Sequence, residues 1–521
     1  MKKIFSILTS TFLILNFSAM AIDVVELKMP KSNKVVIELM FRNGSISDPA
    51  GKEGLADLTA SVLTEGGTAT MTHKQITDRI YPWAAGYSGS VDKEVTVFRF
   101  EVPSDFADQF YDIVKGLILT ASFTKEDFDR VKNNQQNYVE QVIKASSDEE
   151  YSKKALEDLL FRGTNYQHLV QGTASGVKAI TLDDVKKFYK AYFAQNNLTI
   201  GIAGNYSDAF LEKLKKDMAG LPAGISCFAN ETIPAVPATG RTPDGIQIEI
   251  ISKDKALGSA VFTGFPLPVT RKDDDFAALM IANSWLGEHR KSYSLLYRKI
   301  REQRSMNYGD YSYIEWYQNG GQNMLPTYGV PRTSNYFSIW LRPVQTAKGL
   351  KGQYPELSSI TVGHAHYALR MALREMNNLV TNGLTQEQFE QTRDFLRSYN
   401  KLYVQDPAHQ LGFRMDSHFY GRTDYITEMD ALLAKLTVAD VNNAMKKYWQ
   451  TNNMFITIVT DASEAEPLAA SLKANKPSPM SYSNNLKGSL EKKILDEDEI
   501  VAKYPLNVKS VTIVNSADMF K

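Results

Sequence analysis

Cysteine is almost absent from this sequence, with Cys227 alone among 521 residues. One cysteine cannot form an internal disulfide, and it cannot build the Cys-rich sites that hold structural zinc. Net charge is absent too, because 59 Lys and Arg residues balance 59 Asp and Glu residues. A neutral chain lacks the basic surface that binds nucleic acid or an anionic membrane, so both are excluded as primary ligands.

Long hydrophobic runs are also missing, since no stretch beyond the N-terminus reaches the roughly 18–20 apolar residues of a membrane span. At the N-terminus, Lys2 and Lys3 precede a short apolar run and the small-residue pattern Ala19-Met20-Ala21. This order predicts a cleaved secretory signal, with a mature chain that starts at Ile22. We expect a periplasmic or secreted protein without a membrane anchor; a buried N-terminal helix is the alternative.

An internal repeat is present in the mature chain. Each copy contains helical segments that start at a Thr suited to cap a helix, followed in one case by a turn and an alternating apolar strand. The matched segments occur in the same order in both copies: 124–128 with 385–389, 161–163 with 419–421, and 181–202 with 437–458. The repeat indicates two copies of one large unit.

Strand and helix patterns alternate within each copy. Runs of β-branched and aromatic residues predict strands, and amphipathic stretches predict helices. The strands are expected at 35–41, 95–102, 246–251 and 336–341, and the helices at 106–117, 125–143 and 365–380. We therefore predict an α+β protein of two homologous sheet-plus-helix domains.

Domain boundaries follow from the repeat and from composition. A Pro- and Gly-rich stretch between the copies is typical of a linker. The last part of the chain has a charged segment and a short apolar strand, and it packs either on the body or on a partner. The predicted division is signal peptide 1–21, N-terminal domain 22–222, linker 223–244, C-terminal domain 245–475 and tail 476–521.

Metal-binding motifs are missing from the sequence. None of its seven histidines belongs to a His-Glu-x-x-His or His-x-x-Glu-His motif. His364 and His366 have alternating ligand spacing but no close acidic partner, so we expect a solvated helix start there. No metal site is predicted for this chain.

One segment resembles a known family. Residues 41–45 and 54–68 are similar to the first strand and helix of the pitrilysin (insulinase, mitochondrial processing peptidase) family of zinc metallopeptidases. In active members the helix reads Gly-Leu-Ala-His-x-x-Glu-His, where the histidines hold zinc and the glutamate is the general base. The matching positions here are Asp57, Ala60 and Ser61. The family's third ligand is a glutamate on a later helix, where this chain has amides at 135–137 and Glu140 as the nearest acid. The resemblance therefore implies a degenerate zinc site.

A second segment, residues 295–308, is similar to the family's C-terminal-domain motif, in which a tyrosine follows an arginine by seven residues. Arg301 and Tyr308 match it. In the family this pair reaches the zinc site of the other half, where the tyrosine stabilises the developing oxyanion and the arginine positions substrate. The alternative is a solvated basic cluster with Arg298 and Arg304, beside a half-buried tyrosine.

The resemblance also implies a substrate strand. Residues 89–97 follow the segment Trp83-Ala84-Ala85-Gly86, where active members present an exposed sheet edge. A peptide would add there as a strand, with Gly89, Ser90 and Val91 as the binding residues. The alternative is an interior strand that is already paired on both sides.

Three functional hypotheses follow. The first is the zinc-free subunit of a heteromeric peptidase: two domains form half of a clam-like chamber, a homologous partner chain carries the zinc, and this chain supplies Arg301 and Tyr308. The second is a non-enzymatic peptide-binding or scaffold protein of the same fold. The third is an autonomous hydrolase that uses Asp57, Glu65 and His73.

Overall fold

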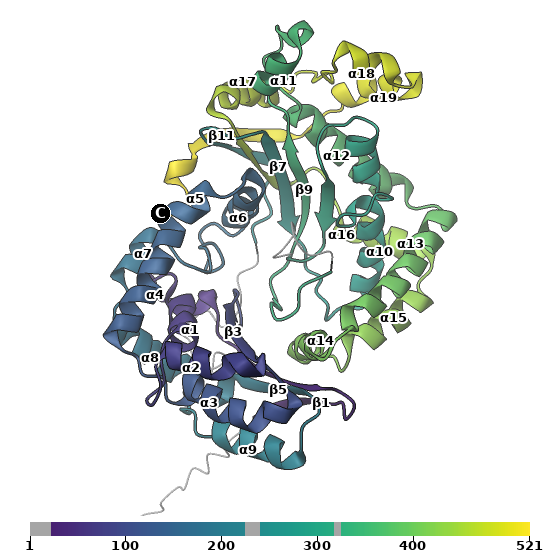
Figure 1. Ribbon diagram of the computed structural model, residues 1–521. Coiled ribbons are helices and arrows are strands. Elements are labelled where there is room, and N and C mark those ends of the chain that lie inside the picture. Colours follow the sequence, from purple (N-terminus) through teal and green to yellow (C-terminus); the bar gives the residue numbers. More distant parts are fainter. Residues whose placement is uncertain (1–21, 225–239, 317–324) are drawn as a thin grey trace, which may run out of the picture.

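The protein is seen in a computed structural model that describes residues 22–224, 240–316 and 325–521. The predicted signal peptide 1–21 and most of the predicted linker, with Cys227, lie outside the described residues. Figure 1 shows two units, each a sheet with helices packed on it, with the N-terminal unit mostly in purple to blue and the C-terminal unit mostly in teal to yellow. The predicted α+β class is confirmed.

The N-terminal sheet has five strands in the order β1-β5-β2-β4-β3. Strands β1 and β5 run parallel, whereas the other neighbours are antiparallel. The strands are β1 (Asp23–Lys28), β2 (Lys34–Phe41), β3 (Gly86–Val91), β4 (Thr96–Pro103) and β5 (Leu198–Gly204). Strand β3 therefore lies at one edge of this sheet.

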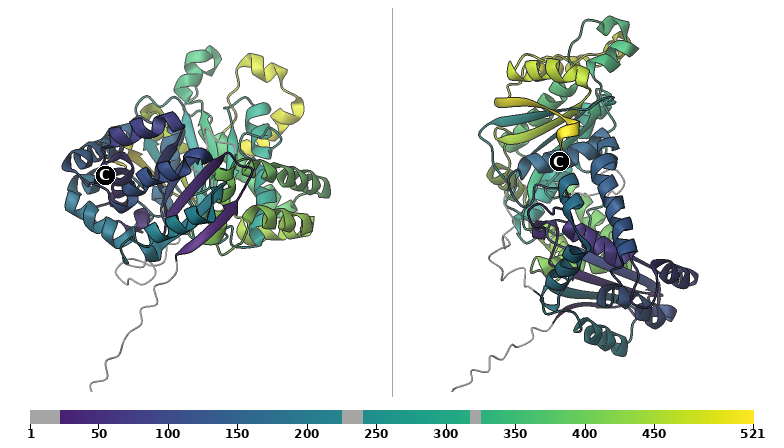
Figure 2. Two further views of the ribbon diagram at one scale, coloured as in Figure 1. Left: turned by 60° about the horizontal axis from the view of Figure 1, so that its bottom comes forward. Right: turned by 90° about the vertical axis from the view of Figure 1, so that its left-hand side faces the viewer.

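The C-terminal sheet repeats this order and adds one strand, giving β11-β6-β10-β7-β9-β8. Its strands are β6 (Ile246–Ser252), β7 (Ser259–Pro266), β8 (Asp310–Tyr313), β9 (Tyr336–Val344), β10 (Met454–Thr460) and β11 (Val508–Asn515). The added strand β11 comes from the tail and pairs in parallel with β6. The tail thus packs on the body, as the yellow strand in Figure 2 shows.

Matching helices cover the outer face of each sheet. In both copies the predicted Thr caps are present: Thr181 accepts a hydrogen bond from the Asp184 amide at 3.2 Å, and Thr437 accepts one from the Asp440 amide at 3.3 Å. The N-terminal helices are α1 (Leu55–Glu65), α2 (His73–Ile80), α3 (Ala107–Leu119), α4 (Lys125–Asn137), α8 (Leu182–Tyr192) and α9 (Asp208–Met218). The C-terminal helices are α10 (Asp275–Gly287), α12 (Ala365–Asn382), α13 (Gln386–Tyr399), α15 (Tyr425–Lys435), α16 (Val438–Tyr448) and α17 (Ala462–Lys473).

The inner face of each sheet is covered by a helix from the other half of the chain. Helix α6 (Asp148–Leu160) buries Leu156 and Leu160 in a cluster with Phe262 of β7 and Trp340 of β9. Helix α14 (Pro407–Phe419) likewise packs on β1, β2 and β5. Its Leu411 and Met415 share a cluster with Val36 and Met40, which alternate along β2 with the outward-packed residues. Figure 1 shows α6 beside β7 and α14 beside the N-terminal sheet. The two halves are thus interlocked.

Buried charges join the halves as well. Arg332, in the C-terminal half of the chain, donates hydrogen bonds of 2.6 and 2.7 Å to the two carboxylate oxygens of Asp92. Asp92 directly follows β3. Lys93 pairs with Glu157 of α6 at 3.1 Å. Burial acts to raise the pKa of Glu157, but Arg332 and Lys93 outweigh it and lower that pKa. The link between β3 and α6 is therefore an ion-paired network that water barely reaches.

One predicted helix is interrupted. The stretch expected as a single helix at 125–143 is α4 followed by a π-helical turn at Tyr138–Val142 and the short α5 (Ile143–Ala145). Within the described ranges, no helix is long and apolar enough to cross a membrane.

A degenerate metal helix and an arginine–tyrosine pair

Helix α1 carries Asp57, Ala60 and Ser61, the positions that the sequence resemblance matches to the zinc motif. Its N-terminus is held by Asp48, whose carboxylate accepts 2.7 Å hydrogen bonds from the amides of Gly54 and Ala56. Of the three positions, Ala60 is buried at 2% exposure, whereas Asp57 and Ser61 keep part of their surface in solvent. Burial, and next the charge of Glu65, raise the pKa of Asp57 to about 7, against the opposing charge of Lys154.

These side chains do not fit a catalytic zinc site. Alanine cannot act as a base, and Ser61 offers neither the imidazole, the thiolate nor the carboxylate that binds zinc in proteins. On α4, Gln135 is used structurally: its Nε2 donates to the carbonyls of Gly54 at 2.9 Å and Gln171 at 2.8 Å. Gln136 donates to the Ala174 carbonyl at 3.1 Å. In the part of the chain that the structure describes, no group of three His, Cys, Asp or Glu side chains is placed to hold a metal ion. Asn137 and Glu140, the other candidates, are exposed.

The prediction of a solvated helix start at His364 and His366 is wrong. Both histidines are buried. His364 Nε2 bonds the Ser481 carbonyl at 2.9 Å, and His366 bonds the Ser471 hydroxyl at 2.9 Å and accepts from Arg370 Nε at 3.0 Å. Tail contacts and helix packing, which the local sequence does not reveal, account for this burial.

The residues of the autonomous-hydrolase hypothesis bond to different partners. Glu65 pairs with Arg130 at 3.1 Å. His73 Nδ1 lies 3.3 Å from the Tyr87 hydroxyl. Neither contact involves Asp57, so the described contacts give no nucleophile–base arrangement for this trio.

Arg301 and Tyr308 lie together at the surface of the C-terminal unit. Arg301 Nη1 donates to the backbone carbonyl of Tyr308 at 3.1 Å, and its guanidinium lies 5.5 Å from the Tyr308 ring centre and 4.8 Å from that of Tyr297. The Tyr308 side chain is not half-buried but 76% exposed. Its hydroxyl is accordingly accessible to a bound molecule or a partner protein.

Arg301 belongs to a π-helix, Tyr297–Glu302, which sequence patterns did not indicate. π-helical turns are rare in proteins, and those that occur are often found at functional sites. The basic cluster around it is not simply solvated, because Arg304 is completely buried.

The tail fixes this π-helix through helix α19 (Lys492–Ala502). Arg304 Nε donates to Asp498 at 2.7 Å, and its Nη2 donates to Glu497 at 2.8 Å. Lys299 of the π-helix also reaches Glu497, at 2.7 Å. Three charge-assisted bonds therefore position the element that carries Arg301.

Gly89, Ser90 and Val91 lie in β3, which pairs with β4 on one side. Gly89 and Ser90 are exposed, whereas Val91, the third predicted binding residue, is buried and packs into the core of this unit. The predicted range 89–97 also includes the start of β4, which is an interior strand paired with both β2 and β3. A Cβ at Gly89 would lie 2.9 Å from Thr64 Cγ2, so β3 lies directly against α1. No Lys or Pro in β3 obstructs pairing at its edge.

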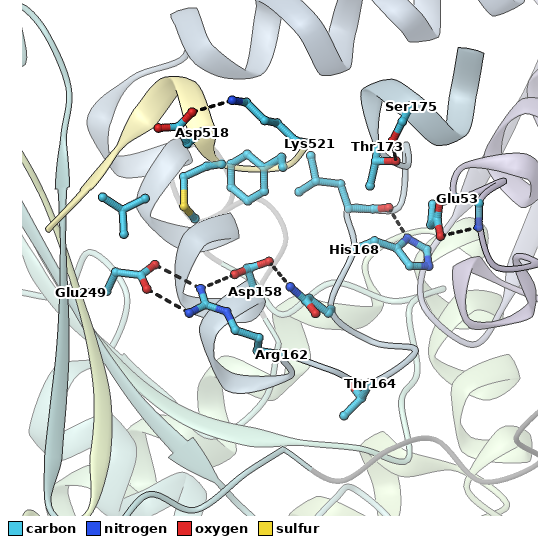
Figure 3. A pocket seen from close by; sticks show the side chains of 16 residues that line it. Glu53, Asp158, Arg162, Thr164, His168, Thr173, Ser175, Glu249, Asp518 and Lys521 are labelled. Carbon is cyan, nitrogen blue, oxygen red and sulfur yellow. Dashed lines mark hydrogen bonds and ion pairs between the residues drawn. The ribbon is translucent and has the colours of Figure 1, made fainter. Parts of the chain in front are cut away.

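A large cavity of about 670 Å³ lies where the two halves meet. Figure 3 shows Arg162 between Glu249 of β6 and Asp158 of α6, with His168 on the other side of the cavity. Arg162 bonds Glu249 at 3.0 and 3.1 Å and Asp158 at 2.7 Å. Burial lowers the pKa of His168 to about 4, so it is neutral at pH 7. These charges are satisfied within the protein, as suits a structural seam between the halves.

Comparison with known proteins agrees with this geometry. The family model described as insulinase (peptidase family M16) matches residues 23–174, and the model described as the peptidase M16 inactive domain matches residues 179–338. The chain belongs to the insulinase, or M16, peptidase family.

Individual relatives are distant. The chain is 21% identical over 428 residues to the non-peptidase homolog YmxG of Helicobacter pylori, covering 82% of this chain and 88% of the relative. A solved peptidase M16 inactive domain from Pseudomonas fluorescens matches with a TM-score of 0.70 at 20% identity, covering 85% and 96% of the two chains. A chain of complex III2 from Candida albicans matches with a TM-score of 0.64 at 12% identity, covering 84% and 93%. The structural matches establish the fold.

Proposed function

We propose that this chain is the zinc-free subunit of a two-chain peptidase, in which a homologous partner carries the zinc. The observation that carries the proposal is the exposed Arg301–Tyr308 pair on a chain whose α1 lacks ligands and base. A pair that is held by the tail and open to solvent suits completion of a site on another chain.

In this role Tyr308 acts through its hydroxyl. When a peptide carbonyl is attacked, negative charge develops on its oxygen, and a positioned O–H donor stabilises that charge. Arg301 keeps Tyr308 in place through the bond to its carbonyl, and the remaining N–H groups of the guanidinium can bind the peptide backbone. No proton transfer or metal ligation is asked of this chain.

The peptide would lie along β3. Among the described residues no strand pairs with its outer edge, whose main-chain donors and acceptors can bind an extended peptide with little regard to sequence. The exposure of Gly89 and Ser90 supports this position. The substrate is then a peptide or an unfolded protein segment, and the signal at residues 1–21 would place the reaction in the periplasm or outside the cell.

A second function is supported by the same strand alone. If no zinc-bearing partner exists, the open β3 edge would serve a peptide-binding or scaffold protein of this fold. The relative named a non-peptidase homolog supports this alternative.

Reconstitution tests the proposal. The mature chain is mixed with a family member from the same genome that carries His-x-x-Glu-His, and a quenched fluorescent peptide is supplied. We expect a stable complex and turnover that needs both chains. A zinc-bearing chain that is equally active alone, with no complex on gel filtration, would contradict it.

A further inference from the structure

A cavity of about 310 Å³ opens beside the Arg301–Tyr308 pair. Its size is at the lower end of ligand pockets. All of its lining residues are arginines or tyrosines: Arg290, Tyr297, Arg301, Tyr308, Tyr311 and Arg342. Such a lining presents hydrogen-bond donors and positive charge, which is the chemistry that binds an anion.

Acidic groups around the cavity offset part of this charge. Arg342 Nε pairs with the buried Glu149 of α6 at 2.8 Å. Asp310 lies close by and accepts a 2.7 Å hydrogen bond from Asn307, but burial raises the pKa of its carboxyl to about 8. It is therefore mostly protonated at neutral pH, and the cavity keeps a net positive charge.

The charges of the lining arginines also act on the neighbouring His289. Burial is the main reason that its pKa falls to about 3, and Arg290 and Arg342 are among the charges that lower it further.

The cavity is built on a constrained backbone. Arg301 lies on the π-helix, with its guanidinium against the rings of Tyr297 and Tyr308. Arg290 has a φ of +56°, in the left-handed region that a non-glycine residue rarely adopts. Backbone outliers of this kind persist where the surrounding structure enforces them, often at binding sites.

We propose that this cavity binds a carboxylate of the peptide substrate, either its C-terminus or an acidic side chain. The guanidinium fork matches a carboxylate in a bidentate fashion, and tyrosine hydroxyls add further donors. The inference rests on the proposed function, because it assumes that a peptide binds this chain. It adds a preference: Arg290 and Arg342 select acidic peptides, whereas Arg301 and Tyr308 serve the scissile bond.

Binding of synthetic peptides tests the inference on the full mature chain. Fluorescence anisotropy is measured with a labelled peptide of alanine, serine and valine that carries one glutamate and a free C-terminus. Two related peptides replace the glutamate with glutamine or amidate the C-terminus. We expect one of these changes to weaken binding at least about tenfold. Loss on amidation identifies the C-terminus, and loss with glutamine identifies the side chain.

Variants then locate the effect. The double variant Arg290→Gln with Arg342→Gln should bind the parent peptide and the modified peptides with affinities within about twofold of each other. Two of the three guanidinium groups of the cavity are then gone. The control is Arg397→Gln on α13, a partly exposed arginine paired with Asp430 at 2.9 Å, which should keep the full difference in affinity between the peptides.

Three results would overturn the inference. If all three peptides bind equally, the carboxylate pocket fails while the proposed peptide binding stands. If the preference survives in a folded double variant, the carboxylate binds elsewhere. If no peptide binds, the proposed function fails and the inference with it. The comparison of peptides on the unmodified chain needs no variant, so a misfolded variant does not remove the test.

Discussion

Asp498 of the tail accepts a 2.7 Å hydrogen bond from Arg304, a completely buried arginine three residues after Arg301. The hydroxyl of Tyr482 donates to the same carboxylate at 2.7 Å, and that of Tyr367 also donates to it. The tail thus supplies the main counter-charge of a buried cation. These contacts and the Lys299–Glu497 pair fix the position of the π-helix Tyr297–Glu302.

Replacing Asp498 should therefore be costly. We expect Asp498→Ala to lower the free energy of unfolding by about 3 kcal/mol, because it leaves a buried guanidinium with Glu497 as its remaining acid. Urea unfolding measures this. Glu499→Ala is the control, because Glu499 is exposed and its ion pair with Lys503 is long, at 3.7 Å. It should lower the free energy of unfolding by less than about 0.5 kcal/mol. Equal small effects for both variants would show that the tail does not anchor the π-helix.

In the reconstituted pair of chains, Tyr308→Phe should lower turnover about ten- to a thousandfold while assembly is kept, because it removes one donor to the oxyanion. Arg301→Ala should cost at least as much, since it also frees Tyr308. Steady-state cleavage of a fluorescent peptide is the measurement. Tyr354→Phe, at a half-buried tyrosine beyond helix α11 (Ala347–Gln353), should leave turnover unchanged. Turnover within about twofold of the parent in both Tyr308→Phe and Arg301→Ala would favour the scaffold function.

The purified chain should carry no stoichiometric zinc, because Asp57, Ala60 and Ser61 provide neither a ligand set nor a base. Metal analysis after gel filtration measures this, with a His-x-x-Glu-His family member prepared in parallel as the control. One tightly held zinc ion per chain, removable by chelator with loss of peptidase activity, would refute the interpretation of α1.

Peptide binding at β3 should depend on alternate amides of the peptide, because successive N–H groups of a strand point in opposite directions. We expect methylation of every second amide nitrogen to weaken binding at least about tenfold in one register and only slightly in the other. The two methylated peptides are matched controls for each other. Equal affinities for both registers would exclude pairing along the Gly86–Val91 edge.

Asp310 should make stability depend on pH. Its carboxyl loses its proton near the ordinary value in the unfolded chain but near pH 8 in the folded protein, so the unfolded state binds fewer protons between these values. Its contribution is consequently present at acidic pH and is lost as the pH rises toward 8. Asp310→Asn should flatten the fall in unfolding free energy between pH 5.5 and 7.5 by about 2 kcal/mol. Asp105→Asn, at an exposed aspartate, is the control variant. A slope in Asp310→Asn equal to that of the parent would show that Asp310 is ionised throughout this range.

Local patterns in the sequence predicted the parts of the fold that depend on local chemistry. Thr181 and Thr437 cap equivalent helices because their side chains bond to nearby amides. Local patterns do not show which sheet the apolar face of a helix packs on. Leu156 and Leu411 look like ordinary core residues, and nothing near them in sequence indicates that each packs on the sheet of the other half.

The candidate site shows the same division. The Arg301–Tyr308 spacing was visible because the two residues are near in sequence and resemble a family motif. Arg290 and Arg342 join them from separate elements, and Asp498 is 194 residues away from Arg304. Only the folded chain brings these charges together.

The exchange of α6 and α14 has a consequence for how the protein is made. During synthesis α6 leaves the ribosome before β7 and β10, the strands that bury Leu156 and Leu160. The inner face of β2, with Val36 and Met40, likewise waits for α14. The first repeat therefore cannot complete its packing until the second has been translated, and exposed apolar faces of this kind favour aggregation. Two repeats in sequence thus amount to a single folding unit, and separate expression of either repeat should yield an incompletely packed protein.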